Sequence, residues 1–274
     1  MDTVSLNKVF HDHECSYYDE RFGIAHDDAD ARAALADVES ALGRDLATDH
    51  VVLDVGCGTG WFAAGLERLA PETVVLGLDL SSGMLSKAAG AGASRLIQAQ
   101  CEAVPLPDSC ADVVVSRGVL HHVPDPGAAL AEWRRLVKPD GAVLLASEPT
   151  PAVDRAGAVL VRHLLSIPGL RGGLSEEQEF WEMAAMAANL HTFTKPELVE
   201  MCVAAGFTRV SLAATGFSQT LVMTASYVLH GHAPSAAGRV PWRRLISFAA
   251  SADTLLDRAI PERWRHTVAG VIRP

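Results

Sequence analysis

Three glycines and two aspartates form the part of this sequence where residue types and spacing most clearly indicate chemistry. Gly56, Gly58 and Gly60 follow Asp54, which nearly ends an apolar run that starts at residue 51. Glycines at this spacing allow positive φ angles and let a flat ligand approach the backbone closely. Asp79 ends the next apolar run, where its carboxylate suits two ribose hydroxyls. We therefore expect a nucleotide-type pocket, although the Gly-x-Gly-x-Gly spacing differs from the Gly-x-Gly-x-x-Gly of dinucleotide folds.

Strands and helices must alternate to bring these residues to one edge of a sheet. The expected strands lie near 50–55, 74–79, 95–99, 112–116 and 142–147, and the helices near 61–69, 82–90 and 127–137. This order predicts an α/β fold with a parallel sheet and helices on both faces. Residues 138–141, Lys-Pro-Asp-Gly, predict the turn into the fifth strand.

Two stretches compete for the last strand, residues 221–229 and residues 267–272. We favour the terminal stretch, because apolar residues between 217 and 265 mostly have helical spacing.

Four stretches carry a family resemblance: residues 51–60, 77–85, 99–107 and 114–126. They look like the successive motifs of class I S-adenosylmethionine-dependent methyltransferases. Residues 120–126, Leu-His-His-Val-Pro-Asp-Pro, and 137–141, Val-Lys-Pro-Asp-Gly, resemble the branch that includes ubiquinone/menaquinone-type and sugar O-methyltransferases. The resemblance implies a Rossmann-like, seven-stranded, mostly parallel sheet with an antiparallel last strand, helices on both faces and an inserted helical cap. It also implies S-adenosylmethionine as the cofactor.

By this resemblance, the cofactor lies along the glycine loop. Asp54 and the loop glycines hold its methionine half and ribose edge, Asp79 accepts from the ribose hydroxyls, and Met84 lies along the adenine. A tyrosine before the core can approach the cofactor carboxylate. Gln100 stands where the family usually has Asp, and its amide oxygen can still accept from the adenine amino group. The expected cofactor residues are Tyr18, Asp54, Gly56, Cys57, Gly58, Gly60, Asp79, Leu80, Met84, Gln100, Cys101, Glu102 and Ser116.

His121 and His122 follow the fourth strand, where the resembled fold places groups that face the transferring methyl. An imidazole can accept a hydroxyl proton near neutral pH. Because two adjacent side chains rarely point into one cavity, we expect His121 to be the base in preference to His122. Glu148, at the end of the fifth strand, would orient the imidazole or help to bind the acceptor, as an acidic residue does in similar sugar O-methyltransferases. The alternative is that neither histidine acts as a base.

The chain divides into a core and several additions. Residues 1–48 are expected to be an N-terminal lid, irregular at first and then helical over 28–42, with Leu35, Val38 and Leu42 on one face. The remaining segments are a cofactor-binding core at 49–150, a helical cap at 151–192, a continuation of the core at 193–216, a second helical insertion at 217–264 with a possible acceptor-binding role, and a last strand at 265–274. Phe180, Trp181, Met183 and Met186 in the cap suggest an apolar acceptor.

Charge and composition limit the partners. The net charge of -10 argues against nucleic acid, because phosphate binding needs a basic surface. Residues 239–274 carry seven Arg and three acidic side chains, so weak association with an anionic surface is possible. The uncharged stretch 210–238 is too polar to span a membrane. Five cysteines without Cys-x-x-Cys spacing, and no sequence typical of a secretion signal, predict a cytoplasmic protein.

No metal site is expected. His11-x-His13 and His230-x-His232 lack further ligands at useful spacing, and the fourth strand ends in Ser116-Arg117-Gly118, without the carboxylate of Mg-dependent catechol-type enzymes.

The leading hypothesis is a metal-independent methyltransferase that acts on a hydroxyl, or an acidic carbon, of a small apolar molecule. The alternatives are C-methylation of a prenylated quinone or lipid, and a protein that binds S-adenosylmethionine without catalysis.

Overall fold

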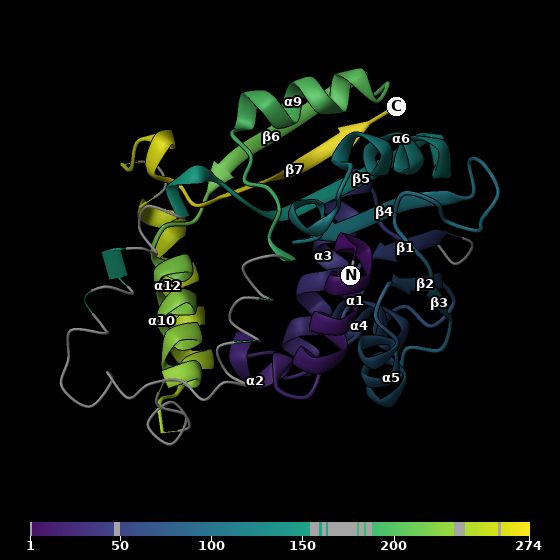
Figure 1. The fold of residues 1–274 in the computed structure, drawn as a ribbon. Helices are drawn as coiled ribbons and strands as arrows, with labels where there is room; N and C mark the ends of the chain where they lie inside the picture. The colour runs from purple at the N-terminus through teal and green to yellow at the C-terminus, as the bar shows by residue number, and fades with distance from the viewer. Residues whose placement is uncertain are drawn as a thin grey trace.

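The computed structural model describes residues 2–46, 50–153, 159–160, 163, 180, 184, 188–232, 239–256 and 259–274. A seven-stranded sheet runs through it in the order β3-β2-β1-β4-β5-β7-β6 (Figure 1). The strands are β1 (Val51–Val55), β2 (Val74–Asp79), β3 (Leu96–Gln98), β4 (Ala111–Arg117), β5 (Val137–Pro149), β6 (Arg209–Thr215) and β7 (Thr267–Arg273). Strands β1 to β5 pair in parallel, whereas β7 is antiparallel to both β5 and β6. The predicted Rossmann-like sheet is therefore confirmed.

Helices cover both faces of the sheet. On one face lie α3 (Asp28–Leu42), α4 (Trp61–Leu69) and α5 (Ser82–Ala91), and on the other lie α6 (Pro126–Leu136) and α9 (Lys195–Ala204). Alternate residues of β1 supply the two cores: Val52 packs towards α3 and α4, and Leu53 and Val55 pack towards α6 and α9. Asp54 shares the face of Val52, because side chains alternate along a strand.

The register of the parallel strands gathers the expected site residues at one edge. Val55 of β1 pairs with Leu78 of β2 and with Ser116 of β4, which in turn pairs with Leu145 of β5. The order of the strands reverses at β1, and ligands of open α/β sheets bind in the crevice beyond the strand ends at such a point.

The last strand is the terminal one, as favoured from the sequence, and the competing stretch 221–229 lies inside helix α10 (Ser218–His232). One boundary differs from the prediction. Strand β5 already begins at Val137, so residues 138–141 interrupt a strand instead of preceding it. The pairing jumps from Ala111↔Val137 to Val113↔Ala142 across this stretch, which is the irregularity expected of a Pro-Asp-Gly sequence.

The N-terminal segment differs more. Residues before 28 were expected to be irregular, but they form α1 (Thr3–Glu14) and α2 (Tyr18–Phe22). The Asp2 side chain caps α1 by accepting a hydrogen bond from the Ser5 amide at 2.8 Å.

Helix α3 has the predicted bounds, but it covers the sheet instead of the cofactor site. It buries Ala31, Ala34, Val38 and Ala41, and a Cβ on Gly65 of α4 would lie 3.0 Å from the Ala31 Cα. These small side chains let the two helices approach closely. Residues of α1, and none of α3, line the cavity described below.

Helix α10 packs alongside α12 (Trp242–Leu256), and the pair stands apart from the sheet layers in Figure 1. There are two short 3₁₀ turns: η1 (Leu120–His122) follows β4, and η2 (Glu262–Trp264) precedes β7. Most of the predicted cap at 151–192, including Trp181, Met183 and Met186, lies outside the described residues, whereas Phe180 is described and half exposed. Among the helices of the described residues, none is long and apolar enough to cross a membrane.

Candidate active site

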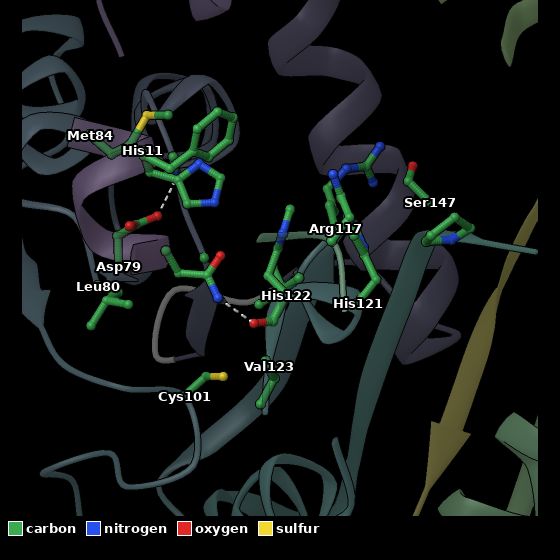
Figure 2. A pocket seen from close by; sticks show the side chains of 18 of the residues that line it. His11, Asp79, Leu80, Met84, Cys101, Arg117, His121, His122, Val123 and Ser147 are labelled. Carbon is green, nitrogen blue, oxygen red and sulfur yellow. Dashed lines mark hydrogen bonds between the residues drawn. The ribbon is translucent and has the colours of Figure 1, made fainter. Parts of the chain in front are cut away.

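A cavity of about 610 Å³ lies at the carboxyl ends of the parallel strands. Its wall comes from α1 and α2, the glycine loop, the end of β2, residues 99–102, the turn η1, the end of β5, helix α10 and the start of β7. Figure 2 shows Asp79, Leu80 and Met84 on one side, Arg117, His121 and Ser147 on the other, and His122 between them.

The glycines of the loop serve different purposes. All three have positive φ angles, of 68°, 53° and 82°. A Cβ on Gly56 would lie 2.3 Å from a methyl of Val119, and one on Gly60 would lie 2.6 Å from the Ala88 Cβ, so these two glycines are needed for the packing of the protein itself. A Cβ on Gly58 would meet nothing within 4 Å, and Gly58 lines the cavity. Gly58 therefore presents the open stretch of backbone against which a ligand can lie.

Asp79 lies in the wall beside this loop. Its carboxylate accepts hydrogen bonds from the Gly58 amide at 2.9 Å and the Ser81 amide at 2.8 Å. Burial raises the pKa of this carboxyl above its ordinary value. A carboxylate has about four acceptor positions, so Asp79 retains acceptor capacity for a ligand diol.

The predicted cofactor residues fall into two groups. Those in the cavity wall are Tyr18, Gly56, Gly58, Asp79, Leu80, Met84, Gln100, Cys101 and Glu102. Burial raises the pKa of the Tyr18 hydroxyl, so this group stays protonated. Behind the wall lie Asp54, Cys57, Gly60 and Ser116.

Asp54 and Ser116 are the most unusual members of the second group. Both are buried, and Asp54 Oδ2 and Ser116 Oγ have no hydrogen-bond partner among the described residues. Burial raises the pKa of Asp54 to about 7. The Asp54 carboxylate interacts with the Ala63 amide in the first turn of α4, so it supports the loop from behind.

His121 and Glu148 form a pair. Glu148 is fully buried at the end of β5, and its Oε2 lies 3.1 Å from His121 Nδ1. The same carboxylate accepts hydrogen bonds from the backbone amides of Val119, Leu120 and His121 at 3.0 to 3.2 Å. An ionised carboxylate only accepts, so Nδ1 must donate to it and Nε2 is left with a lone pair. His121 lines the cavity, whereas Glu148 lies behind it.

A bulge directly before Glu148 explains how this carboxylate reaches the turn. The pairing of β5 with β7 shifts between Leu145 and Glu148, and Ser147 adopts a φ angle of 62° there. Bulges re-aim strand ends and occur often beside active sites. Ser147 itself lines the cavity.

His122 also lines the cavity, but its surroundings differ from those of His121. Its Nδ1 donates to the Ala188 carbonyl at 2.9 Å, and its ring lies 3.9 Å from the His121 ring and 4.9 Å from the His11 ring, between centroids. Burial, followed by the neighbouring histidines, lowers the pKa of His122 well below its ordinary value. His122 is therefore held neutral and is a weak proton acceptor.

Helix α1 supplies several lining residues that the sequence analysis missed. Asn7, Phe10, His11 and Glu14 all line the cavity. The Asn7 amide nitrogen donates to the His122 carbonyl at 2.7 Å, and its buried Oδ1 has no partner among the described residues. One signal was present at the start of the helix, because Asp2 can act as an N-cap.

Two further missed features are Arg117 and the far end of the cavity. Arg117 donates to Asp37 at 2.8 Å and lies over the Trp61 ring. The far end is lined by Phe22, Pro149, Val153, Gln219, Met223 and His266, which the sequence does not bring together because they come from four separate segments of the chain. Among the described residues, no group of three or more His, Cys, Asp or Glu could hold a metal ion.

Comparison with known proteins gives the family. Residues 53–145 match the family described as a methyltransferase domain. The demethylmenaquinone methyltransferase of Geobacillus kaustophilus is 32% identical over 168 residues, which are 58% of this chain and 71% of that protein. The chain belongs to the class I S-adenosylmethionine-dependent methyltransferases. Its similarity to the Geobacillus protein puts it with the ubiquinone/menaquinone type.

Other relatives share less of their length with this methyltransferase. The malonyl-[acyl-carrier protein] O-methyltransferase of Yersinia pestis is 36% identical over 111 residues, so the chain spans only 41% of that protein's length. A solved structure of Haemonchus contortus phosphoethanolamine N-methyltransferase 2, with S-adenosylhomocysteine bound, has a TM-score of 0.54 at 16% identity, covering 89% of this chain and 52% of that one. This likeness supports the fold.

The residues at the Asp79 end of the cavity fit S-adenosylmethionine. Gly58 offers open backbone, Asp79 has free acceptor capacity for ribose hydroxyls, and Leu80 and Met84 provide apolar surface for a base. When bound, this cofactor supplies a methyl group activated on a sulfonium.

Proposed function

We propose that this methyltransferase transfers a methyl group to a hydroxyl of a small, largely apolar molecule, with His121 as the general base and Glu148 as its positioning residue. The observation that supports this most is the 3.1 Å contact between His121 Nδ1 and Glu148 Oε2, in the cavity that also contains Asp79. The acceptor lies on the His121 side, across the cavity from Asp79.

The proposed mechanism needs few protein groups. Nδ1 of His121 donates to the buried carboxylate, so Nε2 accepts the proton of the acceptor hydroxyl as the oxygen is methylated. The Glu148 carboxylate stabilises the imidazolium that forms. Hydrogen bonds from three backbone amides fix the position of this carboxylate. The enzyme otherwise holds the acceptor oxygen in line with the methyl carbon and excludes water.

His122 is less suited to this role. Its Nδ1 donates to a carbonyl, which stabilises an imidazolium less than a carboxylate does, and its pKa is lowered. We assign it to the wall of the site, where its carbonyl also receives the Asn7 amide.

The acceptor class follows from the cavity lining. Phe10, Phe22, Val123, Val153 and Met223 all contribute apolar side chains to the cavity wall. Among the described residues that line the cavity, Arg117 is the only Lys or Arg, and its guanidinium is paired with Asp37. These surfaces favour a neutral acceptor over an anionic one.

His121→Ala tests the base. We expect turnover to fall by roughly 100-fold while S-adenosylhomocysteine affinity stays within a few-fold, because the base acts on the acceptor and not on the cofactor. The measurement is S-adenosylhomocysteine release with a panel of hydroxylated aromatics, sugars and quinols, with cofactor affinity by isothermal titration. His122→Ala is the matched control and should lose much less activity. Unchanged turnover in His121→Ala would refute the assignment.

A second candidate function is C-methylation of a prenylated quinone or another lipid. One face of α12 exposes Leu245, Phe248 and Leu255, the last two at 75% and 79% exposure, next to the exposed Arg244. Apolar side chains flanked by arginine are typical of helices that lie on an anionic membrane surface. Relatives named as quinone methyltransferases agree with such an acceptor.

Co-sedimentation with phosphatidylglycerol/phosphatidylcholine vesicles separates this candidate from the first. If the acceptor is a lipid, Phe248→Asp combined with Leu255→Asp should reduce severalfold the fraction of protein that sediments with the vesicles, since both changes put a charge into the apolar contact. Val203→Asp, on the exposed surface of α9, makes the same change elsewhere and should have no effect. Wild-type protein that stays in the supernatant would count against a lipid acceptor.

A further inference from the structure

His266 is a buried histidine that neither the base nor the cofactor site uses. It directly precedes β7, has no exposed surface, and lines the cavity at the end opposite Asp79. Neither of its ring nitrogens has a hydrogen-bond partner among the described residues. A neutral imidazole carries one donor and one acceptor, and leaving both unsatisfied in the interior is unfavourable.

The neighbours of His266 are already engaged or apolar. The Phe217 ring lies 5.1 Å from the imidazole, between centroids. The Thr267 hydroxyl donates to the Thr215 carbonyl at 3.0 Å. Asp253, a nearby charge, accepts from the Ser218 and Gln219 amides and from the Ser218 hydroxyl. The described protein therefore supplies no partner for this ring, although it holds the ring in place.

The strand pairing fixes where His266 lies relative to the proposed base. Glu148 pairs with Val268 across β5 and β7, and the Thr150 amide donates to the His266 carbonyl at 2.9 Å. His266 is thus two residues beyond Val268 and on the same face of the sheet, because side chains alternate along strands. Two residues of extended chain measure roughly 7 Å, so this is the distance along the sheet between the Glu148 and His266 levels.

We propose that His266 binds a second polar group of the acceptor, so that the acceptor is a compact, mainly apolar molecule with neutral oxygen functions at both ends. This inference rests on the proposed function: one oxygen is methylated beside His121, and the other is held by His266.

A neutral group fits His266 better than an anion does. Burial lowers the pKa of its imidazole, so the ring is uncharged near neutral pH. A hydroxyl can both donate to and accept from such a ring, and a carbonyl can accept from it. A carboxylate or phosphate would gain no ionic attraction from the uncharged imidazole and would be repelled by the negative charge of Asp253.

The test is a matched pair of ligands. 4-(Hydroxymethyl)phenol and 4-ethylphenol have nearly the same shape and differ in the second hydroxyl. With protein saturated in S-adenosylhomocysteine, titration calorimetry should show the hydroxymethyl compound binding at least about tenfold more tightly to the wild type, because a site built to bond a hydroxyl rejects the analogue that lacks it. In His266→Phe, which keeps an aromatic ring but no polar atom, the preference should vanish or reverse.

His266→Asn is the second variant. The asparagine amide keeps a donor and an acceptor, so part of the preference for the hydroxymethyl compound should return. S-adenosylhomocysteine affinity and the unfolding temperature of each variant show whether the fold is intact. An equal preference in the wild type and His266→Phe, no preference in the wild type, or no binding of either phenol would overturn the proposal.

The two proposals fail in different ways. Loss of methyl transfer is read from S-adenosylhomocysteine release, whereas the ligand preference is read from binding alone. A wild type that discriminates through His266 but methylates no hydroxyl defeats the proposed function. A wild type that methylates hydroxyls with no dependence on His266 defeats only this inference.

Discussion

Asp54 illustrates how one buried residue can support a site without entering it. The sequence pattern predicted it together with the glycine loop, but its position in β1 directs the side chain to the α3 and α4 face. There the carboxyl is buried beneath the loop, and its Oδ2 has no partner among the described residues. Burial raises its pKa from the ordinary 3.8 to about 7.

This pKa gives a stability prediction with a definite sign. Between pH 4 and 7 the native state keeps the Asp54 proton that the unfolded chain releases, so raising the pH destabilises the fold, and the effect is complete above about pH 7. Asn has the same shape without the charge. We expect Asp54→Asn to raise the unfolding temperature of the ligand-free protein by about 3 °C or more at pH 8, and progressively less towards pH 4.

Thermal unfolding followed by circular dichroism at several pH values measures this difference. An increase that is equal at pH 8 and pH 4, or a loss of stability at pH 8, would contradict the buried, unpaired carboxyl.

At the scale of elements, α1 closes the cavity through polar contacts. Asp12 accepts hydrogen bonds from the Ser81 hydroxyl at 2.6 Å and the Gly83 amide at 2.8 Å, and this joins α1 to the first turn of α5. Ser81 also donates its amide to Asp79, the predicted ribose-binding residue, so this joint is in direct contact with the predicted ribose site. The position of Asn7 and His11 in the wall depends on this joint.

Asp12→Ala should therefore weaken the binding of S-adenosylhomocysteine about tenfold, because buried or partly buried hydrogen-bond partners are left unpaired and α1 is released from α5. Lys8→Ala is the control. Lys8 forms a partly exposed ion pair with Asp12, which contributes little to stability, and removing Lys8 leaves the hydrogen bonds of Asp12 with Ser81 and Gly83 intact. Isothermal titration of both variants measures the effect, and equal affinities would show that α1 does not support the cofactor site.

Comparison of α1 with β7 explains which elements could be predicted from the sequence. β7 was predicted because the resembled fold ends in an antiparallel strand and the apolar residues between 217 and 265 mostly have helical spacing, which leaves residues 267–272 for that strand. α1 was missed because its buried face carries Asn7, Phe10 and Glu14, a mostly polar set that faces a cavity and so lacks the apolar periodicity of a core helix.

The residues of the candidate site likewise divide into those that the sequence predicts and those that it does not. Gly58, Asp79, His121 and Glu148 stand at strand ends, so the local pattern locates them before any tertiary structure is known. His266 reaches the cavity because β7 inserts between β5 and β6, and Met223 reaches it because α10 packs against α2 and α12. No local pattern encodes such long-range contacts.

At the scale of the whole molecule, the strand order brings two kinds of wall to one cavity. The parallel part of the sheet provides the Asp79 end, and the β5/β7 pair with α10 provides the His266 end. His121 and His122 follow β4, which lies between β2 and β7 in the sheet. This arrangement separates the proposed cofactor and acceptor sites while keeping them in contact at η1.

The most direct test of this account is a crystal structure of the protein with S-adenosylhomocysteine. We predict that the ribose hydroxyls donate to Asp79, that the backbone at Gly58 lies against the ligand, and that the sulfur faces His121 across open space. A ribose bound away from Asp79, or a sulfur screened from His121 by other side chains of the protein, would contradict the account.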